Sequence, residues 1–187
     1  MLLSFPLMMG MAAVAEPMIK LLIGNVWLPC VPFLQIICFQ QLLYPLHAIN
    51  LSLLQVRGRS ELFLKIQIIK KIMSAIPLIL GVFVGIYYML FGSVIVGFVA
   101  YYINAYYSRP LLSYGIKEQI KDITPSFLIS FFMATIVYLV SFLPLKPLAL
   151  ICLQIPTGII IEIALCEIFR LSEYKEIKGI ILSAIKK

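Results

Sequence analysis

Long apolar runs with few charges recur along this chain, and they constrain its fold more than any other feature. Residues 2–23 and 148–169 are two of them, and each is close to the ~20 residues that a helix needs to cross a bilayer. Inside a bilayer every backbone N–H and C=O group must be paired within the chain, so only helices and closed barrels can span it. The runs are continuous and do not alternate with polar residues, which favours helices over barrel strands. The sequence therefore predicts an all-α integral membrane protein.

The composition excludes an ordinary soluble fold. Hydrophobic residues make up 63% of the chain and charged residues only 12%, and the mean hydropathy is +1.07. A soluble domain carries about 25% charged residues, and a soluble form of this chain would expose large apolar patches to water. The four cysteines have no C-x-x-C spacing and are expected to be inert, mostly buried thiols.

Gly, Pro and polar turns divide the chain into six predicted transmembrane spans. Residues 1–169 are expected to form one six-helix bundle, and residues 170–187 a basic amphipathic cytoplasmic tail. Pro45 is expected to kink the second span. A very short turn at Phe91–Ser93 is expected to separate the third span from the fourth. The predicted spans are residues 2–23, 32–56, 66–90, 94–107, 125–142 and 148–169.

The distribution of basic residues predicts the orientation. The net charge is +7, and with six spans nearly all lysines and arginines fall on one side of the membrane. Lys146, together with Lys20 near the boundary, belongs to the other side. The positive-inside rule makes the basic side cytoplasmic, so both termini are expected in the cytoplasm. The basic side holds Arg57, Arg59, Lys65, Lys70, Lys71, Arg109, Lys117, Lys121, Arg170, Lys175, Lys178, Lys186 and Lys187.

Polar side chains inside the spans are the candidate functional residues, because burying them in lipid is costly. The densest set lies on the second span, where Gln40, Tyr44, His47 and Gln55 are expected on one helical stripe, with Asn50 nearby. Such a stripe suits the wall of a water-filled cavity, but it equally suits hydrogen bonding between packed helices. Asn104 on the fourth span is a weaker candidate for the same cavity.

Two intramembrane carboxylates carry the same open alternatives. Glu16 stands one turn before Lys20, so the two can neutralise each other at i,i+4, or Glu16 can face a substrate or ion. Glu162 lies in the middle of the sixth span, where it is protonated, paired or facing water.

No catalytic constellation stands out. The sequence shows no cluster of metal ligands, no nucleophile beside a matched base, and no phosphate-cradling glycine loop. The expectation is a protein that is not an enzyme and holds no metal or cofactor.

An ordered series of short segments resembles a known family. It comprises Ser4–Leu7, Ile23–Pro29 with a Gly-x-x-Trp-like turn, Pro32–Ile36, Tyr44–Asn50, Gly58–Ser60, Phe63–Lys65 and Ile68–Lys71. Together these segments, within about residues 4–75, resemble the O-antigen and capsule repeat-unit flippases of the multidrug/oligosaccharidyl-lipid/polysaccharide exporter superfamily. The remainder of the chain is similar only in hydropathy and helix spacing.

The resemblance implies a function in polysaccharide or lipopolysaccharide biosynthesis. Such proteins flip undecaprenyl-pyrophosphate-linked oligosaccharides across the bacterial inner membrane by rocking two lobes around a central cavity, driven by an ion gradient. This chain matches only the C-terminal lobe, so the implied partners are a missing N-terminal lobe or a second copy, membrane lipids and a coupling ion, but no nucleic acid. We expect the chain to be a fragment of a longer reading frame.

Alternatives remain open for the function and for the basic residues. A multidrug or cation exporter of the same superfamily, or a non-transporting membrane scaffold subunit, also fits an apolar helical bundle. Arg57, Arg59 and Lys65 can contact the pyrophosphate at the cytoplasmic mouth, or they can serve only to set the topology.

Overall fold

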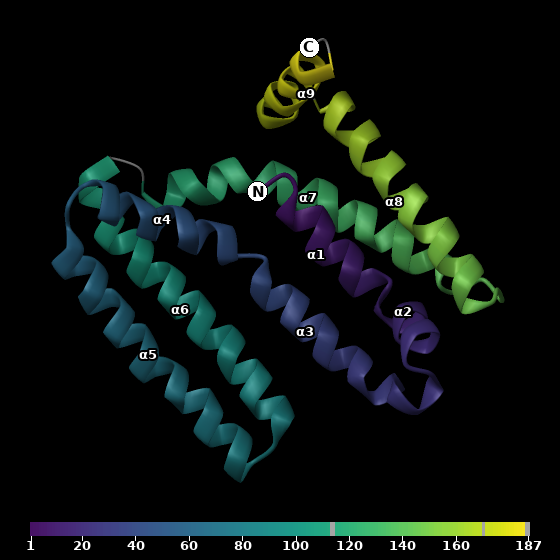
Figure 1. The fold of residues 1–187 in the computed structure, drawn as a ribbon, viewed down its shortest axis with the longest axis horizontal. Helices are drawn as coiled ribbons and strands as arrows, with labels where there is room; N and C mark the ends of the chain where they lie inside the picture. The colour runs from purple at the N-terminus through teal and green to yellow at the C-terminus, as the bar shows by residue number, and fades with distance from the viewer. Residues whose placement is uncertain (113–114, 170, 186–187) are drawn as a thin grey trace. The chain divides into compact units, whose positions relative to one another are not determined.

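The computed structural model describes residues 1–112, 115–169 and 171–185, and leaves the side chains of 108–112, 172 and 180–185 undescribed. The described chain is helical and contains no strand (Figure 1). Its elements are α1 (Ser4–Ala13), α2 (Ala15–Leu22), the 3-10 helix η1 (Asn25–Cys30), α3 (Val31–Gln41), α4 (Tyr44–Val56), α5 (Ser60–Phe83), α6 (Ile86–Leu112), α7 (Ile116–Val140), α8 (Pro147–Ile168) and α9 (Ser172–Ile185).

The described helices confirm an all-α membrane fold. Five stretches are long and apolar enough to cross a bilayer, namely Asn25–Val56, Ser60–Phe83, Ile86–Tyr107, Ile116–Val140 and Pro147–Ile168. A sixth is present if α1 and α2 are counted together as one span. Within the predicted span of residues 2–23 the chain forms two helices, α1 and α2, which meet at a bend of 65°. Pro17 accounts for the break, since it has no N–H to bond the Ala13 carbonyl one turn earlier.

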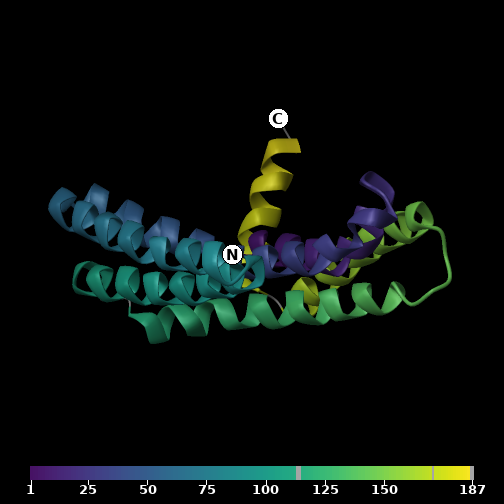
Figure 2. The same cartoon turned by 90° about the horizontal axis from the view of Figure 1, so that it is seen from below.

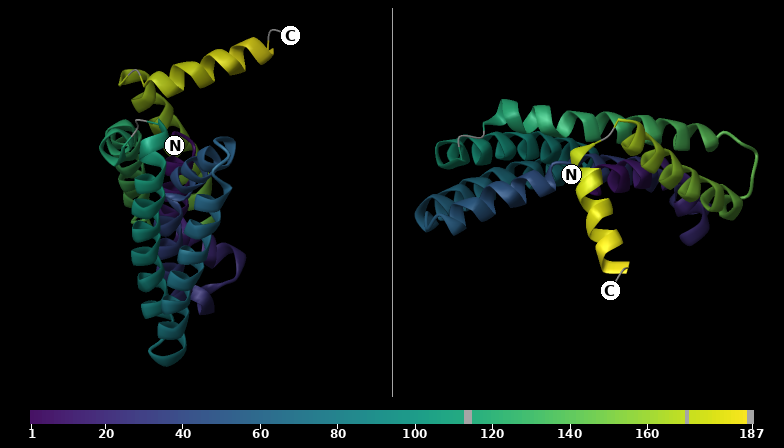
Figure 3. Two further views of the ribbon diagram at one scale, coloured as in Figure 1. Left: turned by 90° about the vertical axis from the view of Figure 1, so that its left-hand side faces the viewer. Right: turned by 90° about the horizontal axis from the view of Figure 1, so that it is seen from above.

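The chain divides into two compact units, where the sequence predicts one bundle. Unit 1 comprises residues 1–31 and 123–187, and unit 2 comprises residues 32–122. In unit 1, α2 packs on α8 and η1, and α1 packs on α8. In unit 2, α5 and α6 form the largest helix pair, and α4 packs against both of them. Figures 2 and 3 show the helices of each unit from further sides.

The α5–α6 hairpin of unit 2 turns about seven residues earlier than the sequence suggests. The turn lies at Val84–Gly85, where Gly85 adopts a φ of +129°, and not at Phe91–Ser93. Residues with a side chain rarely adopt such a φ, so this glycine sets the turn. Gly92 is instead helical, and a Cβ added there would lie 3.4 Å from the Pro77 Cβ across the hairpin. The role of Gly92 is therefore close helix packing and not a turn.

Two other boundaries of unit 2 also differ from expectation. The second span is interrupted at Leu42–Leu43, so that Pro45 begins α4 where a mid-helix kink was expected. Proline fits the first helical turn because the N–H that it lacks would have no partner there. The helix expected to start at residue 125 starts at Ile116, and Pro125 lies inside it.

Apolar side chains at two places hold unit 1 together. Ala13 of α1 packs with Met133 and Val137 of α7 in one cluster. The second cluster joins Leu2 to Ile129, Cys166 and Leu171, and Tyr174 and Ile177 of α9 pack against it. The tail helix α9 therefore packs part of its apolar face against the protein, whereas its amphipathic sequence alone suggests contact with the membrane surface. Three basic residues of the predicted tail, Arg170, Lys186 and Lys187, lie outside the described residues.

Candidate functional site

A buried polar network joins three helices of unit 2. His47 of α4 and Asn104 of α6 are hydrogen-bonded, with 2.9 Å between His47 Nδ1 and Asn104 Nδ2. Asn50, one turn after His47, exchanges two amide hydrogen bonds of 3.2 Å with Gln119 of α7. The Tyr101 hydroxyl of α6 donates to Gln119 Oε1 at 3.0 Å, and its ring meets that of His47 edge-on. Five neutral polar side chains thus meet at one place.

The network is almost completely withdrawn from solvent. Asn50, Asn104 and Gln119 are at most 2% exposed. With the Asn104 amide as donor, His47 is the neutral tautomer that accepts at Nδ1 and carries its proton on Nε2. The other amide atom, Asn104 Oδ1, is buried without a hydrogen-bond partner among the described residues. A buried acceptor left unpaired is costly, so this oxygen is a position at which a further hydrogen-bond donor would be stabilised.

Of the four residues on the predicted stripe, His47 alone lies in this network, together with the candidates Asn50 and Asn104. Tyr44 and Gln55 are exposed on α4 and Gln40 lies on α3, beyond the helix break. The break changes the helical phase between residues 40 and 47, so a stripe drawn on one continuous helix is wrong.

Gln119 is the member of this network that sequence reasoning missed. It stands in a polar segment that the sequence places before the fifth span. The apolar spacing of Ile116, Ile120 and Ile123 signals that a helix starts there. Nothing in the local pattern signals that the glutamine faces inward, because that depends on α4 and α6.

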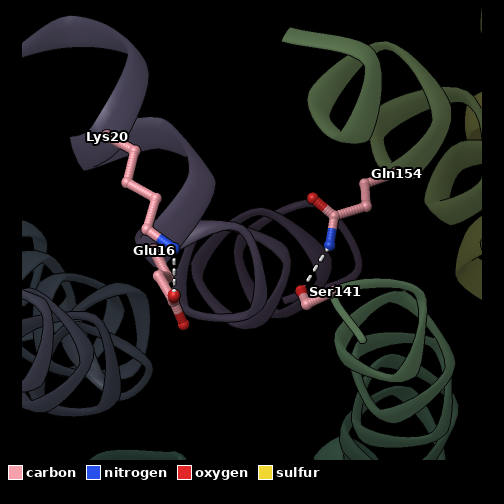
Figure 4. A network of polar contacts seen from close by, with 4 residues as sticks. All are labelled: Glu16, Lys20, Ser141 and Gln154. Atoms are coloured by element: carbon pink, nitrogen blue, oxygen red, sulfur yellow. Dashed lines mark hydrogen bonds and ion pairs between the residues drawn. The ribbon is translucent and has the colours of Figure 1, made fainter. Parts of the chain in front are cut away.

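Unit 1 holds its polar side chains in separate pairs. Glu16 and Lys20 of α2 form an exposed ion pair of 2.6 Å, which bears out the i,i+4 neutralisation (Figure 4). Gln154 of α8 is fully buried, and its Nε2 donates to the Val137 carbonyl at 3.0 Å. The same Nε2 donates to Ser141 Oγ at 2.7 Å (Figure 4). Its Oε1 is buried without a hydrogen-bond partner in the described part of the chain.

Glu162 brings a carboxyl group into the same unit. The Ser130 hydroxyl of α7 donates to Glu162 Oε1 at 2.9 Å, whereas Oε2 is buried and has no hydrogen-bond partner among the described residues. No basic side chain in that part of the chain pairs with it. A carboxyl in this position needs a proton, water or ligand at its second oxygen.

The predicted head-group residues lie at one end of unit 2. Arg57 caps the C-terminus of α4, Arg59 precedes α5, and Lys65 stands in the second turn of α5, all three exposed. Among the described residues, no group of three or more His, Cys, Asp or Glu side chains is arranged to hold a metal ion.

Comparison with known proteins gives one match. A family model described as polysaccharide biosynthesis protein matches residues 1–32. No curated protein matches the chain. No solved structure matches it either. The match supports, at a coarse level, a membrane protein related to polysaccharide synthesis. It covers the α1–α2 bend, η1 and the first residues of α3, and it stops short of the polar network.

Proposed function

We propose that this chain is part of a transporter that flips undecaprenyl-pyrophosphate-linked oligosaccharide repeat units across the bacterial inner membrane. The observation that carries the proposal is the match of residues 1–32 to polysaccharide biosynthesis proteins, on a chain with five or six membrane-crossing helices. Intermediates of polysaccharide assembly that are built on a lipid must cross the bilayer with a large polar head. A multi-pass helical protein suits that step.

The polar groups of the two units support the proposal chemically. Sugar hydroxyls donate hydrogen bonds, and three buried acceptors have no partner among the described residues, namely Asn104 Oδ1, Gln154 Oε1 and Glu162 Oε2. A polar head group that enters the protein would satisfy such acceptors, whereas a lipid tail would not. The exposed Arg57 and Arg59 give the end of α4 a positive potential that attracts a pyrophosphate.

The proposed location is the bacterial inner membrane, with both termini in the cytoplasm. The proposed partners are a further lobe, supplied by the rest of a longer chain or by a second copy, and a coupling ion. An antibody against the 171–185 segment, used on blots of native membranes, tests whether the further lobe belongs to the same chain. A band of roughly two to three times the 21.1 kDa of this chain supports the longer chain. A band at that mass requires dimerisation.

The function itself is tested by reversing the basic charges. We expect Arg57→Glu with Arg59→Glu, made in the whole native protein, to lower the delivery of lipid-linked glycan to the outer leaflet by at least tenfold while membrane abundance stays unchanged. A tenfold loss corresponds to ~1.4 kcal/mol, in keeping with ~1 kcal/mol for each basic residue near an anionic group. Lys146→Glu, an exposed basic residue on the other predicted side, is the matched control. Normal glycan export by the double variant would contradict the proposal.

Each alternative function has one observation in its favour. The unpaired Glu162 Oε2 favours a cation or multidrug exporter, because such a substrate needs an acidic contact. The mutual pairing in the unit 2 network favours a scaffold subunit, whose buried polar groups hold helices together. Transport of an organic cation by the reconstituted whole protein would establish the first. Normal glycan export in a strain lacking the protein would contradict the flippase proposal and leave the scaffold subunit as the alternative.

A further inference from the structure

A groove runs along the start of the α5–α6 hairpin in unit 2. Its volume is about 370 Å³, within the range of small-molecule sites. Among the described residues, apolar side chains form most of its lining, Lys65 carries the one full charge, and Tyr107 closes the α6 side. The remaining lining residues are Leu62, Ile66, Ile68 and Ile69.

The groove combines a charged end with an apolar interior. Ile66 is 1% exposed and forms the floor, whereas Lys65 is exposed and has no ion pair among the described residues. From Lys65 to Ile69 the helix advances roughly 6 Å away from the polar α4–α5 turn. Lys65 therefore lies nearer the polar turn than the three isoleucines, so a molecule along the groove places an anionic end at Lys65 and hydrocarbon against the isoleucines.

The position of the groove indicates what kind of molecule binds there. Both walls belong to candidate membrane spans, Ser60–Phe83 and Ile86–Tyr107, and the groove lies near the end of each. Between residues 57 and 65 the chain carries Arg57, Arg59 and Lys65 against the single acid Glu61, an excess of two positive charges. Basic residues at the end of a span attract anionic head groups, and a lysine reaches them while its apolar stem stays on the protein.

We propose that this groove binds a phosphate-bearing membrane lipid, with one hydrocarbon chain against Ile66 and Ile69 and the phosphate at Lys65. The site is separate from the buried network of His47, Asn104 and Gln119, and it does not depend on the proposed flipping activity. Its chemistry suits a lipid phosphate, because the charged group among the described lining residues is a lysine.

Selective quenching by brominated lipids tests the proposal in the full chain. Tyr107→Trp with Trp27→Phe places the single tryptophan at the groove wall. The protein is reconstituted in phosphatidylcholine vesicles that contain either brominated phosphatidylglycerol or brominated phosphatidylcholine. We expect stronger association of the anionic lipid, and a roughly fivefold loss of that preference in Lys65→Gln, the effect of one basic side chain near an anionic lipid.

Three further variants separate a groove from a general attraction of anions. Lys65→Arg, which keeps the positive charge, retains the preference for the anionic lipid. Lys71→Gln also retains it, because Lys71 is an exposed lysine of α5 outside the groove. Ile69→Phe fills the groove and abolishes the preference with Lys65 still present. Equal quenching by the two lipids in the parent protein would overturn the proposal. So would protection from both lipids, as by a second protein copy, or a preference that survives Ile69→Phe.

Discussion

The two compact units bury polar side chains in different ways. In unit 2 the buried groups are neutral and bond to one another across α4, α6 and α7. In unit 1 the Glu162 carboxyl has one oxygen bonded to Ser130 and the other without a partner among the described residues. Paired amides are inexpensive to bury, whereas a lone carboxylate oxygen is not. Unit 2 therefore uses polarity mainly to join helices, and the acceptor that it leaves without a partner among the described residues is a neutral amide oxygen, Asn104 Oδ1. In unit 1 a carboxyl oxygen still requires a proton, water or ligand.

The largest expected effect comes from removing the centre of the unit 2 network. Gln119→Leu takes away the acceptor of the Tyr101 hydroxyl and the amide partner of Asn50. Each lost partnership in a buried site costs about 1 kcal/mol or more, so we expect the free energy of unfolding to fall by about 2 kcal/mol. Unfolding of the protein in mixed micelles measures it.

Gln55→Leu is the matched control for that variant, because Gln55 is an exposed glutamine on α4. It should leave the stability nearly unchanged. If both leucine variants had equal stability, the network would not hold the helices of unit 2 together, and the contrast between the units would disappear.

The second prediction concerns access to water. In a background in which Cys30, Cys38, Cys152 and Cys166 are replaced by serine or alanine, we expect Glu162→Cys to react with a polar maleimide about tenfold faster than Asn104→Cys, because thiol labelling requires a solvated thiolate. The two positions compare the units directly. Equal, slow labelling at both would mean that unit 1 is as dry as unit 2.

A third prediction sharpens the description of the hairpin within unit 2. Gly85→Ala forces a side chain into a φ of +129°, and we expect it to reduce the free energy of unfolding by about 1 kcal/mol. Gly92→Ala should cost less, because its Cβ would meet Pro77 at 3.4 Å within an ordinary helix. Thermal unfolding of both variants measures the difference. The reverse order would place the turn back at Phe91–Ser93.

The smallest effect is expected at the tail of unit 1. Lys178 of α9 donates to both carboxylate oxygens of Glu167 at 2.9 Å, and this hydrogen bond raises the pKa of Lys178 above its ordinary value of 10.5. Because the folded pKa is raised, the stabilisation is complete below pH 10.5 and disappears as the pH rises through the raised value. The pair is exposed, so its contribution is small.

Carbon NMR of the lysine side chain should show the pKa of Lys178 falling in Glu167→Gln. Glu176→Gln, an exposed acid on the same helix, is the control. An unchanged titration of Lys178 in Glu167→Gln would mean that α9 is not held to α8 by this contact.

Local pattern predicts some features of this protein well and others poorly. The i,i+4 pair Glu16–Lys20 was predictable because both residues lie on one helix. The hydropathy of residues 2–23 does not predict the α1–α2 bend, because hydropathy does not report the backbone hydrogen bond that Pro17 cannot make. The packing role of Gly92 is not predicted either, since its neighbour Pro77 is distant in sequence.

By itself the sequence determined the class of this protein and the type of its elements. Hydropathy and span length are properties of single segments, and in a bilayer a continuous apolar segment pairs its own backbone groups by forming a helix. Only the tertiary structure decided which polar groups meet. Gln119 finds Asn50 at a separation of 69 residues, and Ser130 finds Glu162 at 32, because helices packed side by side bring distant positions together. A hydrogen bond depends on that proximity and orientation, which no single helix specifies.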